Sequence, residues 1–166
     1  MNYIKLISID CSTKKTGIAF FYNGIYDSHS LLNYSKYKDT DERQAAMAKG
    51  ILEMLNTFSP NAVFIEETYM AQNAQTTKLL TRLQGVVYGW CLVNNAKFYT
   101  IRPTQWRKAL GFVQNKNVKR KELKQQSIDY VEKKYRLKVT DDEADAICIA
   151  DAAIKILKEK GEQYDQ

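Results

Sequence analysis

The sequence predicts an α/β protein built on a mixed five-stranded sheet, in which three antiparallel strands precede two parallel ones and helices cover both faces. The prediction depends on an Asn23-Gly24 hairpin signal between two early apolar runs, and on a later alternation of strands with helices. A two-residue turn joins antiparallel strands, whereas a strand–helix–strand crossover joins parallel ones. We expect one domain over residues 1–166, because this length supplies one full core.

The first three strands are expected over residues 3–10, 16–22 and 25–33. The first of these runs is rich in large apolar residues, as in a central strand that is buried on both faces. Apolar residues at helical spacing then predict a helix over 42–58, with Asp41 or Thr40 as its N-cap. The Ser59-Pro60 dipeptide ends this helix.

The rest of the sheet is expected from a strand over 62–66, a helix over 74–94 and a strand over 97–101. After Arg102-Pro103 we expect a short helix, a loop and two longer helices, over 104–110, 111–118, 119–135 and 141–160. Within the helix over 74–94, Gly85 and Gly89 lie one turn apart. This spacing offers either a place where another helix approaches closely or tight packing inside the monomer.

Charge is distributed unevenly along the chain, whose net charge is +6. Residues 97–138 hold thirteen Lys or Arg and three acids, whereas the rest of the chain holds twelve basic and sixteen acidic residues. A basic segment beside an acidic remainder favours a polyanionic partner. The alternative is a solvated, lysine-rich helix surface.

Cysteine usage and hydropathy exclude several classes of protein. Cys11, Cys91 and Cys148 are scattered and form no Cys-x-x-Cys pair, so neither a disulfide framework nor a zinc site is predicted. No apolar run is long enough for a transmembrane helix, and the N-terminus lacks a signal-peptide pattern. We therefore expect a cytoplasmic protein with no membrane association.

Two carboxylates stand at strand ends: Asp10 ends the first predicted strand and Glu66 ends the fourth. An unpaired carboxylate in a core is costly or changes its pKa, so each acid either caps a turn or belongs to a site. If the two strands are adjacent and parallel, the two acids become neighbours at the carboxyl edge of the sheet, where ligand sites collect.

The start of the last helix adds two more acids. Thr140 and Glu143 fit a capping box, which explains acids in the first turn without any catalytic role. Asp145 lies beyond that turn, and it shares with Asp142 the apolar half of the helical wheel. The opposite, solvated half is marked by Asp151, Lys155 and Lys158.

Converging carboxylates repel one another unless they are protonated or bound to cations. Carboxylate oxygens suit Mg²⁺, for which Mn²⁺ substitutes. A pair of such ions about 4 Å apart is a general apparatus for in-line hydrolysis of phosphodiesters. With the basic segment beside them, Asp10, Glu66, Asp142 and Asp145 predict a metal-dependent nuclease that holds two ions.

Three motifs together resemble the RuvC family of Holliday junction resolvases, which have an RNase H-like fold: Ile9-Asp10, IEETYMAQN over 65–73 and DEADA over 142–146. The resemblance implies that the four acids are the metal-binding and catalytic quartet, with Glu67 as the rival of Glu66. It also implies a homodimeric DNA endonuclease that nicks opposing strands of four-way or branched DNA and leaves 5′-phosphate ends in recombination and repair. The family usually has Pro-Gly after the first Asp, whereas Cys11-Ser12 stands here, so this turn differs.

The same resemblance implies a DNA-contacting set. Tyr69 falls where the family carries an aromatic that stacks on bases at the junction centre; the alternative is a loop aromatic packed on the protein. The family's basic loop and helix start are matched by residues 116–124, in which Lys121 best fits a phosphate contact. The expected contacts are Tyr69, Lys116, Lys119, Arg120, Lys121 and Lys124. The lysine- and tyrosine-rich composition suits a phage or low-GC bacterial variant.

Two other functions fit the same residues. One is an RNase H-like or YqgF-like nuclease that acts on RNA, and the other is a non-catalytic DNA-binding module whose acids serve as caps and turn residues. An actin-like ATPase is disfavoured because Cys11-Ser12 does not provide a glycine-lined phosphate loop. We interpret His29, the lone histidine, as structural or exposed rather than catalytic.

Overall fold

Five strands form one sheet in the order β3-β2-β1-β4-β5 in the computed structural model, which describes residues 4–68 and 73–161. The strands are β1 (Lys5–Asp10), β2 (Lys15–Tyr22), β3 (Ile25–Asn33), β4 (Ala62–Glu66) and β5 (Lys97–Ile101). β1, β2 and β3 pair antiparallel, whereas β4 pairs parallel with both β1 and β5. The predicted mixed sheet is confirmed, and Asn23 and Gly24 both have positive φ in the predicted hairpin turn.

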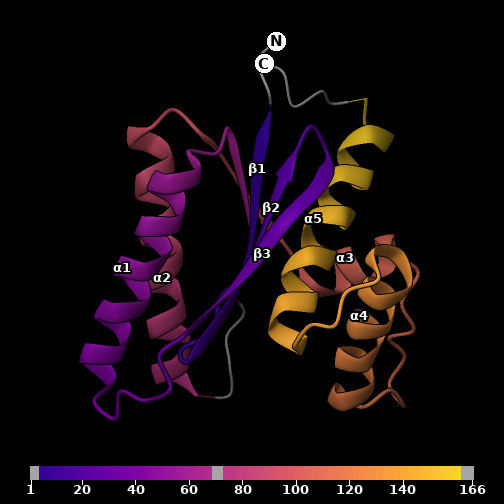
Figure 1. Cartoon of the computed structure of the whole chain (residues 1–166). Helices are drawn as coiled ribbons and strands as arrows, with labels where there is room; N and C mark the ends of the chain where they lie inside the picture. Colours follow the sequence, from indigo (N-terminus) through magenta and orange to yellow (C-terminus); the bar gives the residue numbers. More distant parts are fainter. Residues whose placement is uncertain (1–3, 69–72, 162–166) are drawn as a thin grey trace.

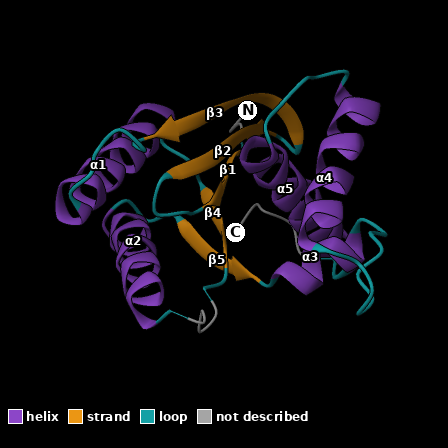
Figure 2. Ribbon diagram, turned by 90° about the horizontal axis from the view of Figure 1, so that it is seen from below, coloured by secondary structure: helices purple, strands orange, loops and turns teal. Residues whose placement is uncertain are grey.

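Helices cover both faces of this sheet (Figures 1 and 2). They are α1 (Thr40–Phe58), α2 (Ala74–Val93), α3 (Pro103–Ala109), α4 (Arg120–Tyr135) and α5 (Asp141–Glu159). α1 and α2 lie on one face, and α3, α4 and α5 lie on the other (Figure 1). No helix in the described ranges is sufficiently long and apolar to cross a bilayer.

The N-cap predicted for α1 is wrong, because the helix begins earlier than expected. Asp39 is the N-cap, and its Oδ1 accepts a hydrogen bond from the Glu42 backbone N–H at 2.8 Å. The cap therefore lies outside both predicted positions, Thr40 and Asp41, which belong to the first turn of the helix.

The alternation of side chains along β1 divides the core into two layers. Ile7 and Ile9 are fully buried against the α1 and α2 side, whereas Leu6 packs in the cluster formed with α5. Ser8 also faces α5, and its hydroxyl donates to the Ala146 carbonyl oxygen at 2.6 Å. Because side chains alternate with a period of two, Asp10 follows Ser8 onto the α5 face.

α5 is buried on all sides through its central turns, from Ala144 to Ile154. The prediction that Asp151 marks a solvated half is therefore wrong: its side chain is 6% exposed. The physical reason is that α4 packs over this side of α5. Asp151 accepts hydrogen bonds from the hydroxyls of Tyr130 at 3.0 Å and Tyr135 at 2.7 Å, and it pairs with Lys134 at 2.9 Å.

Gly85 and Gly89 do not pack tightly inside the monomer. A Cβ added at either glycine would meet no described atom within 4 Å. The same side of α2 exposes Tyr88, Leu92 and Val93, so this helix keeps an open apolar surface.

Candidate active site

The parallel pairing of β1 with β4 brings the two strand-end acids together. The register places Leu6 opposite Ala62 and Ile9 opposite Ile65. Extending it by one residue sets Asp10 beside Glu66, at the carboxyl ends of both strands. This is the neighbourhood that the sequence predicted for these two carboxylates.

The N-terminal turns of α5 bring Asp142 and Asp145 to the same edge. Thr140 caps the helix, and the Glu143 carboxylate accepts from the Thr140 backbone N–H at 2.7 Å, which confirms the predicted capping box. The helix start lies directly against β2, because a Cβ at Gly17 would be only 2.6 Å from the carbonyl carbon of Asp142. Glycine at this position thus permits the close approach that sets the height of Asp142 over the sheet.

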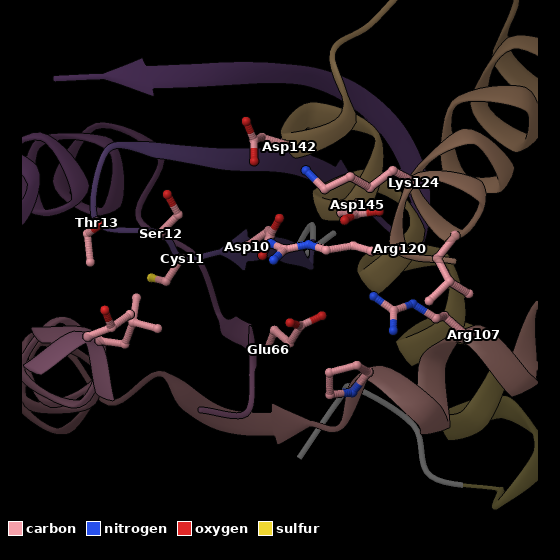
Figure 3. Close-up of a pocket in the computed structure, with 14 residues that line it drawn as sticks. Asp10, Cys11, Ser12, Thr13, Glu66, Arg107, Arg120, Lys124, Asp142 and Asp145 are labelled. Carbon is pink, nitrogen blue, oxygen red and sulfur yellow. The ribbon is translucent and has the colours of Figure 1, made fainter. Parts of the chain in front are cut away.

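All four predicted acids line one pocket of about 520 Å³, together with three cations that enter from α3 and α4 (Figure 3). The acids come from β1, β4 and α5, and the cations are Arg107, Arg120 and Lys124. Lys124 also forms an ion pair with Asp141 at the pocket rim. Cys11, Ser12 and Thr13 form another wall with Thr76 and Leu80 of α2.

Burial raises the pKa of three of these carboxyls, Asp10, Glu66 and Asp145. Burial raises the pKa of Asp10 well above its usual range, and the charges of Glu66, Asp145 and Asp142 raise it further. Burial also raises the pKa of Asp145 to about 6. For Glu66, burial raises the pKa, whereas the Trp106 hydrogen bond, Arg107 and Arg120 lower it. Bound divalent cations would remove the cost of ionising this cluster.

The residue types fit a hard divalent cation, although the side chains do not close around one point. Across the described ranges, no three His, Cys, Asp or Glu side chains form a group that could hold a metal ion. The donor set is nevertheless carboxylate oxygen, which Mg²⁺ and Mn²⁺ prefer. Asp145 Oδ1 is buried and has no hydrogen-bond partner among the residues that the structure describes, although the nearby Ser127 hydroxyl lowers the pKa of Asp145. One carboxylate oxygen of the acid cluster is therefore still unsatisfied.

Two residues that were weighed against the predicted site lie outside the pocket lining. Glu67, the rival of Glu66, has a 43% exposed side chain and lies 4.0 Å from Arg102. His29 lies 3.6 Å from Glu143, in contact with the capping box rather than in the pocket. Of the two adjacent glutamates, therefore, only Glu66 reaches the acid cluster.

The predicted DNA contacts divide into two groups. Arg120 and Lys124 line the pocket, whereas Lys116, Lys119 and Lys121 are exposed residues outside its lining. Tyr69 lies outside the described residues. Arg107 lines the pocket but is not among the predicted contacts. Its position on the short helix α3, directly after the end of β5, is the feature of the sequence that could have indicated it.

Comparison with known proteins points to one family. The family model described as "Crossover junction endodeoxyribonuclease RuvC" matches residues 6–153. A RuvC from Natranaerobius thermophilus, described in the same words, is 25% identical over 123 residues, which are 72% of each chain.

Solved structures give the fold independently. Thermus thermophilus RuvC in complex with a Holliday junction substrate superposes with a TM-score of 0.72 at 19% identity, over 94% of this chain and 96% of that one. The yeast mitochondrial Holliday junction resolvase Ydc2 gives a TM-score of 0.60 at 16% identity, over 92% and 78%. These likenesses confirm the predicted RNase H-like fold. Since the family model spans most of the sequence, from β1 into α5, the chain belongs to the RuvC family of crossover junction endodeoxyribonucleases.

Proposed function

We propose that this protein is a Holliday junction resolvase, a structure-selective endonuclease that nicks opposing strands of branched DNA. The observation that carries the proposal is the shared pocket of four carboxylates and three cations at the carboxyl edge of the sheet. The carboxylates provide metal ligands, and the cations lie where phosphates would approach. Family membership supports the endodeoxyribonuclease activity, and the relatives whose descriptions name Holliday junctions support the substrate.

In this proposal Asp10, Glu66, Asp142 and Asp145 hold two Mg²⁺ ions, or Mn²⁺ in their place. When bound, the ions would supply an activated water and charge stabilisation at the leaving 3′ oxygen. Hydrolysis of the bond between the phosphorus and that oxygen gives one end with a 3′-hydroxyl and one with a 5′-phosphate.

The basic residues form two groups that would contact different phosphates of the DNA. Arg107, Arg120 and Lys124 line the pocket, so they would orient the phosphate that is cut. Lys116, Lys119 and Lys121 are exposed on and before the start of α4, where they would grip phosphates farther along the strand. Stacking of Tyr69 on a junction base remains part of the proposal.

We also propose that the active form is a homodimer and that residues 1–166 act as one nuclease domain. Cutting two opposing strands of a four-way junction requires two active sites in a two-fold arrangement, and each chain offers one such pocket. The open side of α2 suits a second copy because Tyr88, Leu92 and Val93 are 48%, 60% and 81% exposed. Gly85 and Gly89 lie among them and would let a second helix approach closely.

Cleavage of an end-labelled synthetic four-way junction tests the proposal. Linear duplex and an RNA–DNA hybrid serve as competing substrates, and Mg²⁺ is compared with EDTA. We expect symmetric, Mg²⁺-dependent nicks near the crossover that carry 5′-phosphates. Cleavage of the hybrid alone would assign the fold to RNA hydrolysis, and junction binding without any cleavage would leave a DNA-binding module.

A further inference from the structure

Trp106 joins the hydrophobic core to the acid pocket through one hydrogen bond. It is the largest fully buried side chain among the described residues, and it lies on the short helix α3. A buried indole N–H needs an acceptor, and most of the surroundings of Trp106 are apolar. The acceptor is Oε2 of Glu66, at 2.8 Å from Trp106 Nε1.

The indole is held firmly in place. Phe112 packs edge-on against it with ring centroids 5.9 Å apart, and the Arg107 guanidinium lies 4.7 Å from the ring centroid on its face. A donor fixed in this way restricts the direction of the acceptor. Oε2 of Glu66 therefore accepts the hydrogen bond from the buried indole, and Oε1 is the oxygen that remains free to bind a cation in the pocket.

We propose that Trp106 is a positioning residue for divalent-metal binding: its indole N–H fixes the Glu66 carboxylate so that Oε1 is presented to the ion. The inference rests on the proposed function, because it takes Glu66 to be a metal ligand. The arrangement has the form of an outer hydrogen bond that orients an inner ligand.

The chain supplies a matched control in its other tryptophan. Trp90 on α2 is 8% exposed, and its Nε1 donates to Asn56 Oδ1 at 2.7 Å. It packs in the cluster on the α1 and α2 face, on the opposite side of the sheet from Trp106. The two indoles thus have the same chemistry and similar burial, but only the partner of Trp106 lines the acid pocket.

The first experiment compares Trp106→Phe with Trp90→Phe, since each keeps an aromatic ring and loses the N–H. Mn²⁺ binding to the DNA-free protein is measured by calorimetry. We expect Trp106→Phe to weaken Mn²⁺ binding about tenfold, and Trp90→Phe to bind as the unaltered protein does. Junction binding in EDTA should be the same for both variants. Equal Mn²⁺ affinity in the two variants would overturn the inference, because a purely structural role lowers stability without changing metal affinity.

A second measurement avoids any risk that Trp106→Phe folds poorly. The two indole N–H resonances of the ¹⁵N-labelled protein are assigned with Trp90→Phe alone, because the chain has two tryptophans. Mg²⁺ is then titrated into the unaltered protein. We expect the Trp106 resonance to move while the Trp90 resonance stays. An unchanged Trp106 resonance at saturating Mg²⁺ would overturn the inference and leave the proposed function intact. Failure of the unaltered protein to bind either ion and to cut junctions would overturn both.

Discussion

The two helical layers differ in what they bury and in what they leave open. The α1 and α2 layer packs by apolar contact, and α2 exposes Tyr88, Leu92 and Val93 on its outer side. The α3, α4 and α5 layer buries two charged side chains, Asp145 and Asp151, on a single helix. Both layers bury apolar side chains, which is favourable, but only the α3, α4 and α5 layer adds the cost of buried charge among the described residues. That layer contains the candidate site, and the other has a surface open to a partner.

The two buried acids of α5 make the same distinction within one helix. Asp151 is satisfied by two tyrosine hydroxyls and Lys134. Asp145 Oδ1 is buried without a hydrogen-bond partner among the described residues. Hydrogen bonds and an ion pair offset the cost of burying Asp151, whereas the unsatisfied oxygen of Asp145 is a cost that a function would explain. Substitutions at the acid pocket should therefore affect cleavage more than stability, and substitutions elsewhere should do the reverse.

The largest effect is expected from Asp145→Asn. Junction cleavage should fall about a thousandfold, because loss of a metal ligand removes about 4 kcal/mol of transition-state stabilisation. The free energy of unfolding in EDTA should rise or stay unchanged, since a charge in an unfavourable environment is removed. Single-turnover cleavage and urea denaturation measure the two quantities. A clear loss of stability would show that Asp145 is a structural acid like Asp151.

Gly17→Ala should have the next largest effect, because it pushes α5 away from β2. The new Cβ would lie 2.6 Å from the Asp142 carbonyl carbon, so the start of α5 must shift. We expect cleavage to fall about a hundredfold through misplacement of Asp142, and the free energy of unfolding to fall by about 2 kcal/mol. A variant that loses stability but cleaves normally would show that Asp142 does not depend on this contact.

The features that could be predicted from sequence have local causes. The apolar run, the hairpin signal and the Thr140 cap predict β1, the β2–β3 turn and the start of α5. Together with the parallel pairing expected for a crossover, they bring Asp10 and Glu66 to one edge. The resemblance of the motifs to the RuvC family is confirmed by the family match.

The features that could not be predicted depend on packing between distant segments. The burial of Asp151 depends on α4 lying over α5, whereas a helical wheel separates only one apolar side from one polar side. Arg107 reaches the pocket because α3 turns back from the end of β5, and its charge alone did not distinguish it from other basic residues. The Trp106–Glu66 hydrogen bond joins residues forty positions apart, and nothing local to either signals it.

Asp151→Asn tests the structural acid of the same helix. We expect the free energy of unfolding to fall by about 1 to 2 kcal/mol, because the amide keeps one acceptor but loses the charge that pairs with Lys134. Cleavage by the folded protein should stay near that of the unaltered protein, since Asp151 does not line the pocket. Urea denaturation and cleavage of the junction provide the two measurements. If the fully folded variant lost most of its cleavage, Asp151 would have a functional role like that of Asp145, and the two acids of α5 would no longer differ in kind.

Gly85→Ala should have the smallest effect on the fold and the opposite sign to Gly17→Ala. The site is open within the monomer, so alanine should raise the free energy of unfolding of the monomer by about 0.5 to 1 kcal/mol through helix propensity alone. If a second copy packs on this side of α2, the added methyl group should clash there and raise the dimer dissociation constant about tenfold. Urea denaturation at low concentration and sedimentation equilibrium separate the two effects. A more stable monomer with an unchanged dimer would exclude this side of α2 as the interface. A weakened dimer would show that the α1 and α2 layer contributes to function by joining two chains, each of which carries one acid pocket.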